Sequence, residues 1–158
     1  MRFLRRRQRG HALLEFAIGS SVFIALFTGA YQFGYTFHAY ESLLSGVRAG
    51  ARFGAMAVYP LGVQTTDSAP LSAFTTAVRN VTVYGDPAGA ANGAKPIVGG
   101  LLPQHVLVTV EFRNSVPSTV TVSINGYALE SIFGSWAANR KPRATFNYLG
   151  RYDPPPPA

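Results

Sequence analysis

The apolar residues before position 60 lie in one nearly unbroken block. Residues 12–37 read ALLEFAIGSSVFIALFTGAYQFGYTF and contain a single charge, at Glu15. A helix of about twenty residues crosses the hydrocarbon core of a bilayer, so this block is long enough to span a membrane. The first proline of the chain is Pro60. The pattern therefore predicts one long helix over residues 11–59, with a transmembrane segment over about residues 12–37.

The remainder of the chain has the shorter patterns of a small folded domain. Apolar residues recur at helical spacing after Pro70, which predicts a short amphipathic helix over residues 70–81. Glycine and proline are frequent in residues 85–100, which predicts a long loop. We expect a short helical turn over residues 129–136 and an extended, proline-rich tail over residues 153–158.

Three further segments predict strands. Residues 105–113 and 118–129 alternate apolar and polar side chains, as half-buried antiparallel strands do, and residues 114–118 would connect them. A third segment, residues 143–152, is less regular but aromatic. The apolar positions expected to share a face are Val106, Val108, Val110 and Phe112 on the first strand and Val120, Val122 and Ile124 on the second. The chain is therefore predicted to be α+β: a long N-terminal membrane-spanning helix, then a short helix and a small antiparallel β-sheet.

The positive charge of the chain is concentrated at its start. Five of the 14 lysines and arginines lie within residues 1–10, and without them the net charge falls from +7 to +2. The basicity therefore belongs to a leader peptide, and we expect no nucleic acid as a partner. Arginines in front of an apolar helix predict that the N-terminus is cytoplasmic, so residues 60–152 would fold on the other side of the membrane.

The residues that usually perform catalysis or bind metals are sparse. The chain has no cysteine, which excludes disulfides and cysteine-ligated metals. His11, His38 and His105 have no metal-like spacing, and no catalytic or nucleotide-binding motif is present. We therefore expect no enzyme activity, no catalytic residues, no cofactor, no metal and no small-molecule substrate.

The most informative window is the junction between the leader and the apolar helix. The basic leader ends in Gly10, and Glu15 lies a little more than one turn further on. An ionised side chain at bilayer depth costs about 2.5–3.5 kcal/mol, so Glu15 requires an explanation. If the chain is cut after Gly10, His11 acquires a free α-amino group that Glu15 of the same or a neighbouring helix can pair with, which would set the register between subunits. The alternative is that Glu15 lies among lipid headgroups, stabilised only by the helix dipole.

These residues resemble the prepilin processing motif of type IV pilin-like proteins. The Glu15-Phe16 pair, the ten-residue leader and the layout of the chain are similar to those of the TadE-like pseudopilins of the tight-adherence (Flp pilus) system. Segments further on, among them TTAVRNVTVYGD, TVSINGYALESIFG and NYLGRY, are also similar.

The resemblance implies a pilin-like fold and a set of partners. It implies cleavage by a prepilin peptidase between Gly10 and His11, with Glu15 and Phe16 in assembly. It also implies a minor subunit that assembles with other pilin or pseudopilin subunits, in a pilus that serves adhesion and secretion. The protein would lie in the bacterial inner membrane with its C-terminal domain in the periplasm, and would enter an extracellular pilus on assembly.

A second pattern is a column of small residues spaced by multiples of four along the long helix. Its glycines are Gly34, Gly46, Gly50 and Gly54. Such stripes let helices approach closely, and because each glycine costs a helix roughly 1 kcal/mol relative to alanine, packing should offset the loss. Two alternatives remain open: contact with neighbouring subunits, or a position under the protein's own sheet.

Two other functions compete with the pilin-like hypothesis. The first is an uncleaved, membrane-anchored periplasmic binding module, which would retain residues 1–10 and tolerate replacement of Glu15. The second, a membrane-anchored enzyme, is the weakest because the few acidic residues and histidines form no recognisable pair.

Overall fold

The computed structural model describes residues 4–60, 72–114, 116–131, 134–150 and 152–153. The chain divides into two compact units, Met1–Phe37 and His38–Ala158. Helix α1 (Leu4–Met56) contributes residues to both units, and each unit is described separately here.

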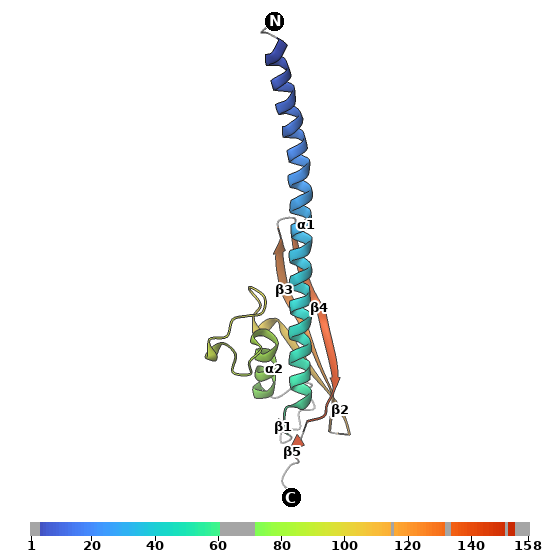
Figure 1. Ribbon diagram of the computed structural model, residues 1–158. Helices are drawn as coiled ribbons and strands as arrows, with labels where there is room; N and C mark the ends of the chain where they lie inside the picture. The colour runs from blue at the N-terminus through green and yellow to red at the C-terminus, as the bar shows by residue number, and fades with distance from the viewer. Residues whose placement is uncertain (1–3, 61–71, 115, 132–133, 151, 154–158) are drawn as a thin grey trace, which may run out of the picture. The chain divides into compact units, whose positions relative to one another are not determined.

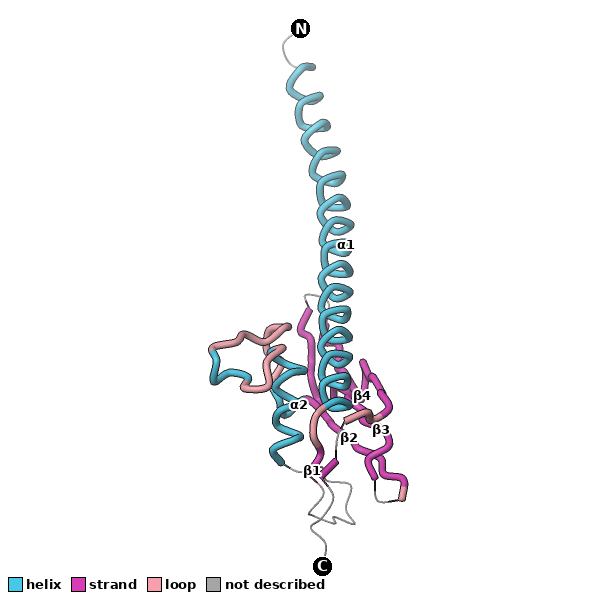
Figure 2. Tube along the Cα trace, turned by 60° about the horizontal axis from the view of Figure 1, so that its bottom comes forward, coloured by secondary structure: helices cyan, strands magenta, loops and turns pink. Residues whose placement is uncertain are grey.

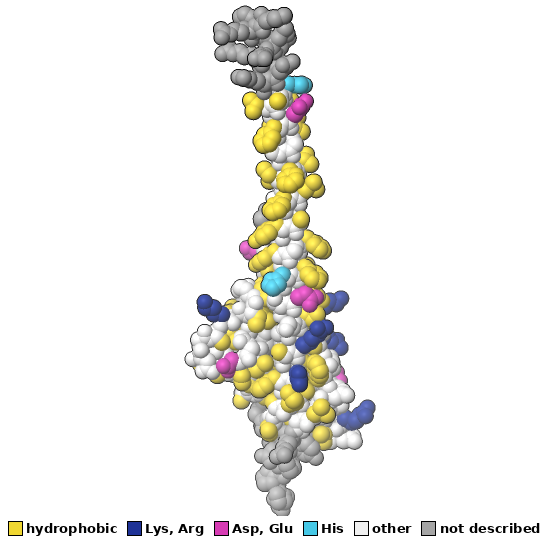
Figure 3. Space-filling view, viewed as in Figure 1, with side chains coloured by type: hydrophobic (Ala, Val, Ile, Leu, Met, Phe, Trp, Pro, Cys, Tyr) yellow, Lys and Arg dark blue, Asp and Glu magenta, His cyan; other side chains and the backbone are white. Residues whose placement is uncertain are grey.

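The described part of the first unit is the N-terminal portion of α1, and its apolar side chains are exposed. The helix from Gly10 to Met56 is long and apolar enough to cross a membrane, with a mean hydropathy of 1.8 over its most apolar stretch, none of which is buried within the chain. Apolar side chains cover the visible face of this unit in Figure 3. The large exposed residues include Leu13, Phe16, Phe23, Leu26, Phe27 and Phe33. A helix that is apolar on all sides is stable when lipid or other helices cover it.

The second unit has two layers, helices and sheet. Strands β2 (Val106–Arg113), β3 (Val116–Ser131) and β4 (Gly134–Asn147) form an antiparallel sheet in the order β2-β3-β4. The end of α1 and helix α2 (Ser72–Tyr84) lie side by side on one face of this sheet (Figures 1 and 2). The expected α+β arrangement, with a long N-terminal apolar helix, a short helix and an antiparallel sheet, is confirmed.

The core of the second unit lies between these two layers. In the register of β2 and β3, Val106 is opposite Ile124, Val108 is opposite Val122, and Val110 is opposite Val120. All six side chains are 5% exposed or less. The helices cover them with Leu43, Val47 and Ala51 from α1 and Phe74 and Val78 from α2. Each fully buried side chain of this size contributes about 1.5–3 kcal/mol, so this contact stabilises the unit strongly.

One sequence prediction is wrong: the described residues of the expected helical turn, 129–131 and 134–136, lie in strands. Leu129–Ser131 end β3 and Gly134–Trp136 begin β4, with Leu129 opposite Trp136 in the register. The alternation of buried Leu129 and exposed Glu130 continues the pattern of β3, and Trp136 packs edge-on against Tyr40 of α1 with ring centroids 5.9 Å apart. These tertiary contacts outweigh the local helical preference of the segment.

The other predicted elements exist, with different ends. Helix α1 begins at Leu4 and ends at Met56 instead of spanning residues 11–59, and α2 covers Ser72–Tyr84 instead of residues 70–81. The third strand covers Gly134–Asn147 instead of residues 143–152.

The connections also differ in detail from the prediction. The expected loop over residues 85–100 contains a short 3₁₀ helix, Gly89–Asn92, and a second, Pro103–His105, precedes β2. Because β3 already begins at Val116, the turn after β2 is shorter than residues 114–118. The tail after residue 153 lies outside the described residues.

Phe112 does not follow the burial of the three valines with which it was predicted to share a face. The register of β2 and β3 shifts between Glu111 and Phe112, which leaves Phe112 42% exposed. Its ring packs edge-on against Tyr59, with centroids 5.6 Å apart.

The end of α1 is held by the chain that follows β4. The Tyr148 hydroxyl donates a hydrogen bond to the Ala57 carbonyl (2.7 Å) and accepts one from the Tyr59 N–H (3.0 Å). The Leu149 N–H donates to the Ala55 carbonyl (2.8 Å). Next to these contacts, β1 (Tyr59–Pro60) pairs in parallel with β5 (Tyr152–Asp153). Because the last carbonyls of a helix have no partner within it, residues 148–149 act as its cap; we call them the C-terminal clasp.

Replacing the Tyr148 hydroxyl should weaken the clasp. We expect Tyr148→Phe to lower the free energy of unfolding by about 1–3 kcal/mol, because two backbone groups lose their partner. Burial raises the pKa of Tyr148, the Tyr59 N–H lowers it, and the neighbouring Tyr59 phenol raises it, with a net rise above the usual value of 10.0. The folded protein therefore holds this proton more tightly than the unfolded one, so stability should fall as the pH rises above about 10.

The measurement is denaturant unfolding of the full chain in detergent micelles between pH 7 and pH 11. Tyr84→Phe is the matched control, since Tyr84 packs against the same core but its hydroxyl has no hydrogen-bond partner among the described residues. An equal loss of unfolding free energy in the two variants would contradict the role of the clasp. So would a Tyr148→Phe variant whose stability falls with alkaline pH as steeply as that of the wild type.

Candidate functional site

The predicted cleavage point lies inside α1 of the uncut chain. Gly10 and His11 follow Leu4, the first helical residue, by less than two turns. A Cβ atom added to Gly10 would meet no heavy atom within 4 Å. Packing within the chain therefore gives no reason for a glycine here, and the surroundings of the Gly10–His11 bond are open to another protein.

Glu15 has one partner in its own helix. The Glu15 Oε1 and His11 Nε2 atoms are 4.0 Å apart, and both side chains are more than 70% exposed. The contact is an ion pair only when His11 is protonated, and exposed pairs one turn apart contribute only about 0.3–0.5 kcal/mol. Glu15 therefore keeps most of its surface for another partner. Phe16, the next residue, is 74% exposed and forms part of the apolar surface of the helix.

Cleavage after Gly10 would change the electrostatics at Glu15. The new α-amino group at His11 would lie four residues from Glu15, a rise of about 6 Å along the helix. Glu15 would then stand close to the N-terminal end of the helix, where unpaired N–H groups and the helix dipole favour a carboxylate. The arrangement can thus pair Glu15 with the amine of its own chain or with that of an adjacent subunit.

The glycine column on α1 divides into two parts. Cβ atoms added to Gly46, Gly50 or Gly54 would meet neighbouring atoms at once, whereas one added to Gly34 would meet nothing within 4 Å. At Gly46 the added atom would lie 2.6 Å from the Thr82 carbonyl, and at Gly50 it would collide with the Thr82 hydroxyl.

The partner of these glycines is mainly α2 of the same chain. At Gly54 the added atom would lie 3.1 Å from both Val78 of α2 and Val120 of β3. Of the two alternatives, the structure shows packing within the chain for Gly46, Gly50 and Gly54, with α2 as the neighbour more than the sheet. Gly34 has no such contact and remains available to another molecule.

Two of these contacts were missed in the sequence. The His11–Glu15 pair could have been recognised from the spacing of four on a predicted helix. The role of Thr82 had no signal of its own, because the predicted helix ended at residue 81, whereas α2 continues to Tyr84. Thr82 is fully buried, its hydroxyl donates to the Val78 carbonyl (2.8 Å), and the absence of a side chain at Gly50 leaves room for it.

Among the residues that the structure describes, no group of three or more His, Asp and Glu is arranged to hold a metal ion.

Together these features define a membrane-associated α+β protein whose apolar N-terminal helix carries an acidic residue close to a glycine. Residues 10–52 match the family model described as TadE-like protein. The match confirms the resemblance to TadE-like proteins over this segment. It includes Gly10, His11, Glu15 and Phe16, whereas Gly54 and the α+β domain beyond it lie outside the matched range. No curated protein and no solved structure matches the chain.

The glycine column leads to a test of packing by substitution. We expect Gly50→Ala to lower the free energy of unfolding of the second unit by about 1–3 kcal/mol, because the added methyl group would displace a buried threonine. The gain in helix propensity, about 1 kcal/mol, offsets only part of this cost.

The matched control is Gly34→Ala, which adds the same methyl group to the same helix in open space. Thermal unfolding of the full chain in micelles, followed by circular dichroism, should show a lower midpoint for Gly50→Ala. For Gly34→Ala the midpoint should be unchanged or higher, because this variant gains helix propensity without a collision. A midpoint for Gly50→Ala at or above that of the wild type would show that α1 and α2 do not approach as described.

Proposed function

We propose that this protein is a minor, pilin-like subunit for the biogenesis of a tight-adherence pilus, and that it acts by assembly and not by catalysis. A prepilin peptidase would cut between Gly10 and His11, and the mature chain would assemble through its N-terminal helix. The observation that supports this most directly is the spacing of Gly10 and Glu15 at the start of an uncovered apolar helix, within the TadE-like match.

The uncovered helix requires two different environments. Before assembly, lipid would cover the exposed residues such as Phe16, Phe23 and Phe27. In a pilus, the helices of neighbouring subunits would replace the lipid. Since lipid tails are as apolar as these side chains, burial alone gives little preference for the assembled state.

The preference would therefore come from polar and small residues. In lipid, a charged Glu15 is costly, and pairing with the α-amino group of a neighbouring subunit would relieve the cost. Gly19, Gly29 and Gly34 have open space where a side chain would be, so they would let an adjacent helix approach closely. Glu15 would set the axial register, and these glycines would set the distance between helices.

The orientation follows from the charge. Residues 1–10 with their five arginines would remain in the cytoplasm until cleavage, and the second unit would fold in the periplasm. The minor role is proposed because a domain with its own two-layer core is bulky for the thin fibres of such systems, a step that rests on family analogy.

The first test is the mass of the mature N-terminus. The protein, expressed in its native membrane with the prepilin peptidase present, should begin at His11. In cells without the peptidase it should begin at Met1. A chain that keeps residues 1–10 in both strains, or one cut beyond residue 37, would overturn the proposal in favour of a membrane-anchored or secreted binding module.

A second test separates processing from assembly. We expect Glu15→Gln to be cleaved at His11 but to be recovered in the assembled pilus fraction at less than about a tenth of the wild-type level, since loss of a charge pair in a water-poor setting removes more than 1.4 kcal/mol. Glu41→Gln is the matched control, because Glu41 is an exposed glutamate further along the same helix. Equal recovery of the two variants would remove Glu15 from the assembly mechanism.

A further inference from the structure

The face of the sheet that is turned away from the helices is polar and regular. The cross-strand register places Leu107, Ser123 and Arg143 on one row and Thr109, Thr121 and Thr145 on the next. A third row contains Glu111, Thr119 and Asn147. The Thr121 and Thr145 hydroxyls are 2.9 Å apart, and the Thr119 hydroxyl donates to Glu111 Oε2 at 2.9 Å. Hydroxyl groups thus continue across this face, from an arginine at one end to a glutamate at the other.

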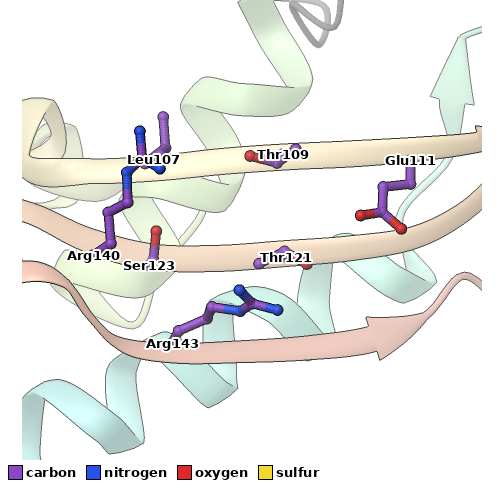
Figure 4. Close-up of a pocket in the computed structure, with 7 residues that line it drawn as sticks. All are labelled: Leu107, Thr109, Glu111, Thr121, Ser123, Arg140 and Arg143. Carbon is purple, nitrogen blue, oxygen red and sulfur yellow. The ribbon is translucent and has the colours of Figure 1, made fainter.

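A hollow of about 190 Å³ opens on this face. Its lining comes from all three strands (Figure 4): Leu107, Thr109 and Glu111 from β2, Thr121 and Ser123 from β3, and Arg140 and Arg143 from β4. In Figure 4 the Arg140 side chain extends toward Leu107, and the Arg143 guanidinium lies between β3 and β4. A hollow of this size is smaller than a typical pocket for a drug-sized ligand, so it suits a single chemical group or one unit of a longer polymer.

Some of the polar side chains around the hollow have no partner within the described fold. Within the described part of the chain, the side chain of neither Arg140 nor Arg143 makes an ion pair or a hydrogen bond. Ser123 is only 5% exposed, and its hydroxyl, which lines the hollow, has no hydrogen-bond partner among the described residues. Since no buried side-chain nitrogen or oxygen among the described residues lacks a hydrogen-bond partner, this hydroxyl is accessible from the hollow, where water or a ligand can bond to it.

The backbone of β4 is distorted where it supplies Arg140. Asn139 is opposite Asn125 and Arg143 is opposite Ser123, so β4 contains two more residues than β3 over this interval. Within this bulge Arg140 has a φ of 55°, in the left-handed region, which costs a residue with a side chain about 1–2 kcal/mol. Bulges redirect side chains and are frequent beside functional sites, and a strained residue of this kind suggests a function that requires it.

The two arginines define the charge of the ligand. Guanidinium groups bind carboxylates through paired, charge-assisted hydrogen bonds. The Glu111 carboxylate lines the same hollow at its other end (Figure 4) and would repel a second anion at that point. The ligand therefore has one carboxylate at the arginine end and neutral polar groups beside it.

We propose that the outer face of the sheet binds a uronic acid unit of an acidic polysaccharide. Arg140 and Arg143 would hold the carboxylate, and the hydroxyls of Ser123 and Thr109 would bond to hydroxyl groups of the sugar. Six of the seven residues that line the hollow are polar or charged, with Leu107 the exception, and extended peptides commonly bind a sheet by adding a strand to its edge. These observations favour a saccharide over an acidic peptide. The site lies in the second unit and does not depend on cleavage at Gly10.

The test is calorimetric titration of the full chain in lipid nanodiscs with trigalacturonate. We expect saturable binding that weakens about tenfold or more in Arg143→Gln and in Arg140→Gln, because each removes a charge-assisted hydrogen bond. Ser123→Ala should weaken it by about threefold to tenfold. The matched control is Arg48→Gln, which removes an exposed positive charge from α1 and should change the affinity by less than about twofold, since a separate surface charge acts only through a screened field.

Several outcomes would overturn the proposal. Galactotriose binding as tightly as trigalacturonate would exclude recognition of the carboxylate. A tetraglutamate peptide that binds more tightly, with the same dependence on Arg140 and Arg143, would assign the site to an acidic peptide. An equal loss of affinity in Arg48→Gln would show that binding depends only on the net charge of the protein. If the wild-type chain does not bind trigalacturonate, the proposed site does not exist. Because Arg140 and Arg143 are both exposed and are changed separately, misfolding of one variant leaves the other to decide.

Discussion

The close approach of α1 to α2 is the contact on which the folded domain depends. Gly46, Gly50 and Gly54 present bare backbone to α2, and Thr82 occupies the space beside Gly50. Only with the two helices this near can both lie on one face of a three-stranded sheet and cover the paired valines of β2 and β3. No helix of the described residues covers the other face (Figure 1), whose polar rows face outward.

The sequence predicted the elements whose pattern is local. The alternating valines of β2 and β3 identified both strands and their buried face, and the unbroken apolar block identified α1. The helical turn over residues 129–136 was wrong because the long β3–β4 hairpin depends on pairs such as Leu129 with Trp136, which no local pattern reveals. The prediction that Phe112 shares the buried face was wrong for a related reason. The register shift next to Glu111 cannot be recognised from the alternation of apolar and polar residues.

The candidate processing site could be predicted from the sequence because its residues are close together along the chain. Gly10 and Glu15 lie within a few residues of each other, so spacing alone suggests their relation. The hollow on the outer face of the sheet could not be predicted from the sequence. Its residues come from three strands, and Arg140 reaches it only through a bulge that becomes visible when β4 is aligned with β3. In the same way, the glycine column was visible but its partner was not, because α2 begins 18 residues after Gly54.

The C-terminal clasp has a mechanical consequence. A tensile load that enters the folded domain along α1 reaches Ala55 and Ala57, and both carbonyls are bonded to the chain that follows β4. Part of the force is therefore transmitted to β4, at the edge of the sheet, and not only to the connection between α1 and α2. Parallel β1 and β5 add backbone pairing at the same point. A subunit built in this way would resist being pulled out by its helix, because the end of α1 and the chain after β4 are bonded to each other.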